Sequence, residues 1–263
     1  MTPIWIFPAY PLLIIGTHAG NLSARIENPS HALTVIIGGF TIQGIGFLVS
    51  LTMYSALVYR LMTQKLPPEP LRPGMFVSVG PAGFTASGTI SMAANLHKAI
   101  IPTSTYMGAP GYLAATILRI IANWLSLWLW GLALWFFFVS CSSHWTVIFI
   151  KSHKMPFAMT WFSFVFPQTA LTTATLAVGE AFDVFAIQVL GCVMTCLLLV
   201  AWCLVVFAMC RAIRRREIMW PEQGEDRVEG GFLTEYNKPR GSALDGMVEN
   251  AEGEMCAKER EDV

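Results

Sequence analysis

Long apolar segments recur along the chain, and short polar stretches separate them. Each segment is long enough to cross the hydrocarbon core of a bilayer, which takes about 20 helical residues. Prolines and charged residues gather in the intervening stretches, where a helix is interrupted most easily. The pattern predicts an all-α polytopic membrane protein with six transmembrane helices, at about residues 3–22, 32–62, 74–96, 111–141, 156–178 and 184–210.

The six predicted helices are of two alternating kinds. The first, third and fifth contain a proline followed by small and hydroxyl-bearing residues, at Pro8, Pro81 and Pro167, whereas the other three have no internal proline. The prolines are 73 and 86 residues apart, which favours a repeated two-helix unit. Because small residues let helix backbones approach closely, we expect three hairpins with the proline-containing helix inside and the other against lipid.

The proline-containing helices are candidates for the wall of a transport pathway. Proline removes a backbone N–H donor, and a broken helix is tolerated at membrane depth where it is buried in protein or faces a cavity. Hydroxyl groups on an uncharged wall suit a small solute that is held weakly. The alternative is three unrelated structural kinks. The candidate kink and lining residues are Pro8, Pro81, Pro167, Gly80, Thr17, Ser78, Thr85, Ser87, Ser163, Thr169, Thr172 and Thr173.

Charged residues are few and unevenly distributed. The chain is 54% hydrophobic and 13% charged, which is about half the charged share of a soluble domain. Residues 217–263 carry 13 acidic and 5 basic residues, a net charge of −8, and are expected to be a disordered tail after a transmembrane domain of residues 1–216. Basic residues flank the helices on the side of this tail, so the positive-inside rule places both termini in the cytoplasm.

Catalytic and metal-binding motifs are missing from the sequence. HExxH, GxSxG, Walker and GxGxxG patterns do not occur, and the six cysteines form no CxxC pair. We therefore expect no enzyme, cofactor, metal site or nucleic-acid partner. His18, the only histidine within a predicted helix, is a candidate for proton coupling, although a structural hydrogen bond would explain it equally. Arg119 is expected to extend toward the membrane surface, with anion attraction as the alternative.

Three stretches resemble a known family. Trp161-Phe-Ser-Phe-Val-Phe-Pro-Gln-Thr169 is similar to a ninth-helix motif of the tellurite-resistance/dicarboxylate transporter family, within the slow-type, voltage-dependent anion channel superfamily. That family includes sulfite pumps and malic acid transporters of fungi. Arg72-Pro-Gly-Met-Phe-Val-Ser-Val-Gly-Pro-Ala-Gly83 and Trp5-Ile-Phe-Pro-Ala-Tyr-Pro11 most resemble the fungal malic acid branch, whose substrates are C4-dicarboxylates.

The resemblance implies a ten-helix fold with five hairpins around a central pore, often in a homotrimer. The six predicted helices then match the fifth to the tenth, and Phe166 matches the phenylalanine that occludes the pore. The implied function is transport of malate and related organic anions, with or without H⁺, across the plasma membrane. Two alternatives stay open. One is sulfite or other small-anion efflux, and the other is a truncated product that associates with full-length subunits without transporting.

Overall fold

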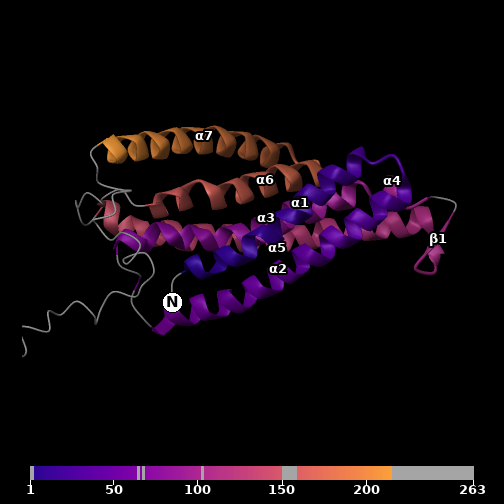
Figure 1. The fold of residues 1–263 in the computed structure, drawn as a ribbon, viewed down its shortest axis with the longest axis horizontal. Coiled ribbons are helices and arrows are strands. Elements are labelled where there is room, and N and C mark those ends of the chain that lie inside the picture. The colour runs from indigo at the N-terminus through magenta and orange to yellow at the C-terminus, as the bar shows by residue number, and fades with distance from the viewer. Residues whose placement is uncertain (1–2, 64–65, 67–68, 102–103, 150–158, 215–263) are drawn as a thin grey trace, which may run out of the picture. The chain divides into compact units, whose positions relative to one another are not determined.

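The computed structural model describes residues 3–63, 66, 69–101, 104–149 and 159–214. In these residues the structure is helical apart from one small hairpin (Figure 1), which confirms the all-α class. Within this described part of the chain, three helices are long and apolar enough to cross a membrane: α2 (Pro29–Thr63), α5 (Gly111–Phe149) and α7 (Phe185–Arg214). The hairpin pairs β1 (Thr105–Tyr106) with antiparallel β2 (Ala109–Pro110).

Each of the three proline-containing segments is a 3₁₀ helix followed by an α-helix, not one α-helix with a proline at its centre. Pro11, Pro81 and Pro167 stand in the first turn of the α-helices, where a backbone N–H has no helical partner in any case. Pro8 lies inside the first 3₁₀ helix. The three pairs are η1 (Pro3–Ala9) with α1 (Tyr10–Arg25), η2 (Glu69–Ser78) with α3 (Val79–Ala94), and η3 (Met159–Phe164) with α6 (Phe166–Ala181).

Several predicted helix ends differ from the structure by two to eight residues; α1 ends at Arg25, α2 begins at Pro29, α6 ends at Ala181 and α7 ends at Arg214. The third predicted helix stops at Ala94, and a separate short helix, α4 (Leu96–Ala99), follows it. The fourth continues to Phe149 instead of ending near residue 141. Its added turns contain Ser142 and Ser143, whose hydroxyls donate to carbonyls of the same helix, so these polar groups are paired within it. Residues 156–158 of the fifth predicted helix and the tail at 217–263 lie outside the described residues.

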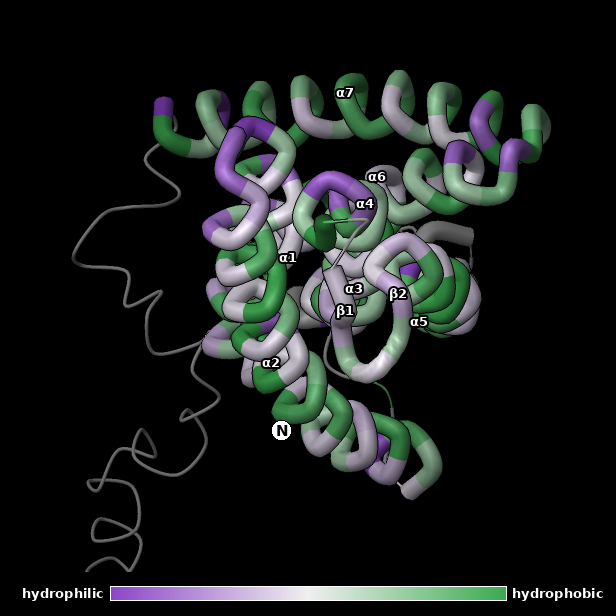
Figure 2. The backbone as a smooth tube through the Cα atoms, turned by 90° about the vertical axis from the view of Figure 1, so that its right-hand side faces the viewer, coloured by the Kyte–Doolittle hydropathy of each residue, from purple (hydrophilic) through white to green (hydrophobic). Residues whose placement is uncertain are grey.

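The α3 helix is the centre of the packing in the described part of the chain. It contacts α1, α5 and α6, and every residue from Val79 to Ile90 is buried. On either side, α1 packs against α2, and α6 packs against α7. The long helices α2, α5 and α7 expose many large apolar side chains, and Figure 2 shows that α7 is hydrophobic over most of its length. Such surfaces suit contact with lipid.

Close contacts between helices depend on glycine at two places. Gly83 in α3 lies against the backbone of α6, where an added Cβ would be 2.8 Å from the carbonyl carbon of Ala170. At the other place, Gly16 and Gly88 leave room for the buried side chain of Gln43 from α2. The Gln43 amide donates to the carbonyls of α1 and α3, at Leu13 (3.2 Å) and Phe84 (2.9 Å). These contacts fix the spacing of α1, α3 and α6.

Candidate functional site

The junction between η2 and α3 is stabilised by tyrosines from neighbouring helices. Val77 and Ser78 are the last two residues of η2, directly before α3. The Tyr10 hydroxyl donates to the Val77 carbonyl across 2.6 Å. Tyr54 of α2 donates to the next carbonyl, that of Ser78, also across 2.6 Å. Broken backbone at membrane depth is tolerated when neighbouring helices supply such bonds.

Three aromatic rings meet beside this junction, one each from α1, α3 and α6. The ring centroid of Phe166 lies 5.2 Å from that of Tyr10 and 5.8 Å from that of Phe84, and the latter two rings are 5.9 Å apart. Tyr10 and Phe84 are 3% and 9% exposed, whereas Phe166 is 38% exposed. Phe166 is therefore the member of the cluster that faces open space in the described chain.

One face of α6 continues from Phe166 toward the far end of the helix. Thr169 is half-buried, and Thr173 and Glu180 are exposed, at the three- and four-residue spacing of one helical face. The two threonine hydroxyls donate to backbone carbonyls of α6 itself. This face, defined by Phe166, Thr169, Thr173 and Glu180, is the exposed α6 face below. Its membrane-depth part offers an aromatic ring, hydroxyl oxygens and no charge.

The structure distributes the predicted lining residues over two environments. Pro8, His18 and Thr173 are exposed, and Thr17 and Thr169 are half-buried. The others are buried between described helices, where three of the hydroxyls donate to backbone carbonyls of the preceding turn. The buried members are Gly80, Pro81, Ser78, Thr85, Ser87, Ser163, Pro167 and Thr172. The pattern of residue types alone does not separate these two groups.

Polar residues gather in a vestibule at the α4 end of the bundle. This cavity of about 280 Å³ lies among α1, α3, α5 and α6. Asn21, Arg119, Asn123 and Glu180 line it. Arg119 thus faces the same cavity as the last residue of the exposed α6 face, which its position in the sequence does not reveal.

The η2 end contains a histidine that the sequence reasoning missed. His18 is not the only histidine within a membrane-crossing helix, because α5 also includes His144. The His144 ring is buried against Phe76 and Phe164, at centroid distances of 5.2 and 5.4 Å. Its Nδ1 lies 2.8 Å from the Ser140 carbonyl and therefore carries the proton in that bond. Sequence analysis placed the end of this helix near residue 141, so His144 was not considered part of it.

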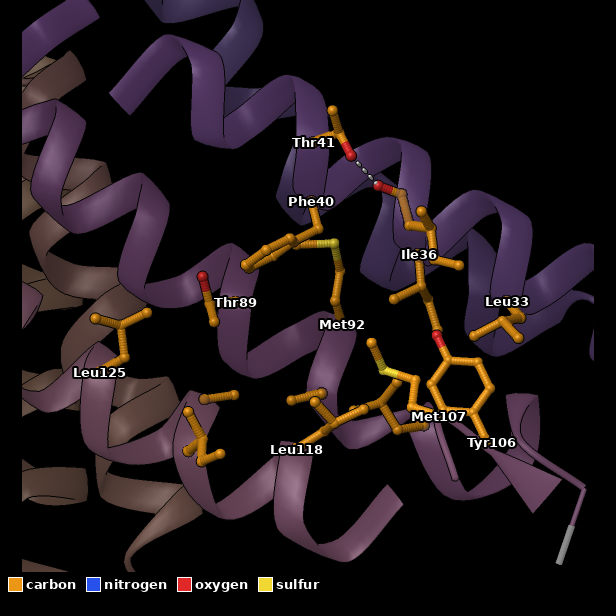
Figure 3. Close-up of a pocket in the computed structure, with 15 residues that line it drawn as sticks. Leu33, Ile36, Phe40, Thr41, Thr89, Met92, Tyr106, Met107, Leu118 and Leu125 are labelled. Carbon is orange, nitrogen blue, oxygen red and sulfur yellow. Dashed lines mark hydrogen bonds between the residues drawn. The ribbon is translucent and has the colours of Figure 1, made fainter. Parts of the chain in front are cut away.

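A separate groove of about 290 Å³ runs between α2 and α5 over α3 (Figure 3). Its lining is mainly aliphatic and aromatic, with Leu33, Ile36 and Leu118 among the contributors. The Thr41 hydroxyl is used by its own helix, through a 2.8 Å bond to the Ile37 carbonyl. Charged side chains are not among the lining residues, so this groove suits apolar chains and not an anion.

Long apolar helices, packed with segments in which a 3₁₀ helix precedes an α-helix, are features of the class of polytopic membrane proteins. The chain belongs to the voltage-dependent anion channel family, whose model matches residues 1–210. This confirms the family resemblance carried by the three motifs. The chain's relatives are named as transporters and pumps.

Three relatives illustrate the range of the family. The chain is 30% identical over 226 residues to a malic acid transport protein of Schizosaccharomyces pombe, covering 86% of this chain and 50% of the relative. It is 26% identical to a sulfite efflux pump of Trichophyton rubrum, with coverage of 80% and 54%. An uncharacterized transporter of Methanocaldococcus jannaschii is 23% identical, with coverage of 83% and 57%. The chain spans about half the length of these relatives, and no solved structure gives a significant match.

Proposed function

We propose that this chain forms part of a membrane pathway for small organic anions, with malate and other C4-dicarboxylates as the substrates. The anion passes along the exposed α6 face, and the Phe166 ring occludes the pathway at rest. The observation that carries the proposal is the position of Phe166. It is the exposed member of a ring cluster drawn from all three proline-containing segments, in a chain of the anion channel family.

The chemistry of the pathway favours passage over tight binding. The hydroxyls of Thr169 and Thr173 supply weak polar contacts, and an uncharged wall does not trap an anion. At the vestibule, Arg119 attracts carboxylates, while Glu180 on the same cavity prevents a deep electrostatic well. Displacement of the Phe166 ring then admits the anion to the membrane-depth section.

The proposal also covers the orientation of the chain in the membrane and the coupling of transport to H⁺. The positive-inside pattern supports cytoplasmic termini in the plasma membrane, so the Arg119 vestibule faces outward. His18 is exposed on α1, one turn from Asn21 of the vestibule, and it carries the proton if transport is coupled to H⁺. The homotrimer implied by the family resemblance belongs to this proposal as well.

Sulfite is the second candidate substrate, and the sulfite efflux pumps among the relatives favour it. Both substrates are small oxyanions, and the described residues of the pathway carry no group that distinguishes two carboxylates from one sulfite.

Uptake of radiolabelled malate into vesicles tests the proposal directly. The assay uses the native protein, at the size that an immunoblot against the acidic tail reveals, because the chain spans about half of its relatives' length. We expect malate uptake that unlabelled succinate or fumarate reduces and that equimolar sulfite reduces less. Uptake of sulfite without uptake of malate would make sulfite the substrate instead of malate. Uptake of neither anion would contradict the proposal.

A further inference from the structure

We infer that Tyr10 is the positioning residue that holds Phe166 in its occluding place. The inference rests on the proposed function, because it concerns the resting state of the Phe166 gate. Tyr10 touches no substrate in this account. It acts through one anchored hydroxyl and one aromatic ring contact.

The hydroxyl of Tyr10 is anchored at the junction between η2 and α3. Val77 lies in the last turn of η2, next to the junction with α3. Tyr10 donates to the Val77 carbonyl from another helix, in a buried bond of 2.6 Å. Gly80 makes the approach possible, because an added Cβ at that position would collide with the Tyr10 hydroxyl. Gly80 and the Val77 carbonyl together hold the Tyr10 hydroxyl in place.

The ring of Tyr10 transmits this anchoring to Phe166. Tyr10 is the first residue of α1, and its ring lies 5.2 Å from that of Phe166 with an interplanar angle of 37°. The Tyr10 ring is almost fully buried, whereas Phe166 is partly exposed and has room to change rotamer. A fixed ring beside a movable one sets the preferred rotamer of the movable ring. Phe84, the other neighbour of Phe166, completes that contact surface.

A matched control is present at the same junction. Tyr54 also donates its hydroxyl to a carbonyl of this backbone, that of Ser78, over the same distance of 2.6 Å. Its ring packs on Phe136 of α5, with centroids 4.3 Å apart, and not on the ring of Phe166. Removing either hydroxyl weakens the η2–α3 junction to a similar degree, but only one of the two tyrosines contacts Phe166.

The test measures basal anion flux in Tyr10→Phe and Tyr54→Phe, with protein amount and melting temperature recorded for both. We expect Tyr10→Phe to raise basal flux about two- to tenfold, the range that follows from losing one hydrogen bond. Tyr54→Phe should leave flux at the wild-type level, with a similar fall in melting temperature. Equal flux increases in both variants would overturn the inference, because junction loosening alone would then open the pathway.

Two further variants separate this inference from the proposed function. In a Phe166→Ala background, Tyr10→Phe should change flux no further, because its target is gone. If Phe166→Ala raises flux while Tyr10→Phe behaves as wild type, the positioning role is wrong and the Phe166 gate stands. If neither variant changes flux, the proposed gate fails together with the inference. An additive increase in the double variant would also overturn the positioning role.

Discussion

Replacing Phe166 by alanine is expected to raise the basal anion flux by a large factor. The ring contacts two others, on Tyr10 and Phe84, and each such contact contributes about 0.5–1.5 kcal/mol. Opening the pathway by moving the ring breaks both, so the alanine variant removes a barrier of about 1–3 kcal/mol, which corresponds to roughly a 5- to 150-fold faster flux. Tracer efflux from vesicles that contain the native-length protein measures this change.

Phe164 provides the control for that experiment. It precedes Phe166 by two residues and packs against Phe76 and His144 instead of the three-ring cluster. We expect Phe164→Ala to lower stability without a comparable rise in basal flux. A Phe166→Ala protein with wild-type flux and selectivity would show that this ring does not occlude the pathway.

The second large effect is expected at Gly83, where valine should disrupt the packing of α3 on α6. The added Cβ would lie 2.8 Å from the carbonyl carbon of Ala170, and a helix backbone cannot move aside as a flexible side chain can. Overpacking typically costs about 1–3 kcal/mol and more against backbone, a large part of a total stability of about 5–15 kcal/mol. We expect little monodisperse protein and a much lower melting temperature in detergent.

Gly131→Val is the comparison for Gly83→Val. Gly131 is an exposed residue of α5, and no heavy atom lies within 4 Å of the position of its added Cβ. Both variants replace glycine by a β-branched residue within a helix, so the change in helix propensity is the same in both. Only Gly83→Val adds the collision. Equal melting temperatures would mean that α3 and α6 do not approach as closely as described.

Periodicity predicted where the helices lie better than it predicted their internal form. The alternation of proline-containing and proline-free segments predicted that the three proline-containing helices lie inside, but it did not single out α3, which is the most buried of them. It did not anticipate the 3₁₀ helices before Tyr10, Val79 and Phe166. In a uniformly apolar stretch no helix face is more polar than another, so the sequence does not distinguish the 3.0-residue period of a 3₁₀ helix from the 3.6-residue period of an α-helix. The end of α5 was missed because Ser142 and Ser143 suggested a polar loop. Their hydroxyls instead donate to carbonyls of α5 itself, and the helix continues.

The candidate site was only partly accessible to sequence reasoning. Phe166 was found through resemblance to a family motif, and an isolated membrane phenylalanine would not have been selected. Tyr10 was not singled out, because its role depends on a hydrogen bond to Val77 that spans 67 positions of the sequence. The distinction between Thr172, which is buried, and Thr173, which is exposed, depends on the rotation of α6. Helix packing sets that rotation, and the residue types do not encode it.

Accessibility of Thr173 tests the central claim, that the exposed α6 face lines the anion pathway. Thr172→Cys and Thr173→Cys are compared with the parent protein while a membrane-impermeant, negatively charged thiol reagent acts on transporting vesicles. A thiol reacts as its thiolate, which forms where water reaches it. We predict that the reagent blocks flux through Thr173→Cys, that malate slows the block, and that Thr172→Cys transports unaffected. Block of Thr172→Cys with Thr173→Cys unaffected would contradict the claim, because the pathway would then lie on another face of α6.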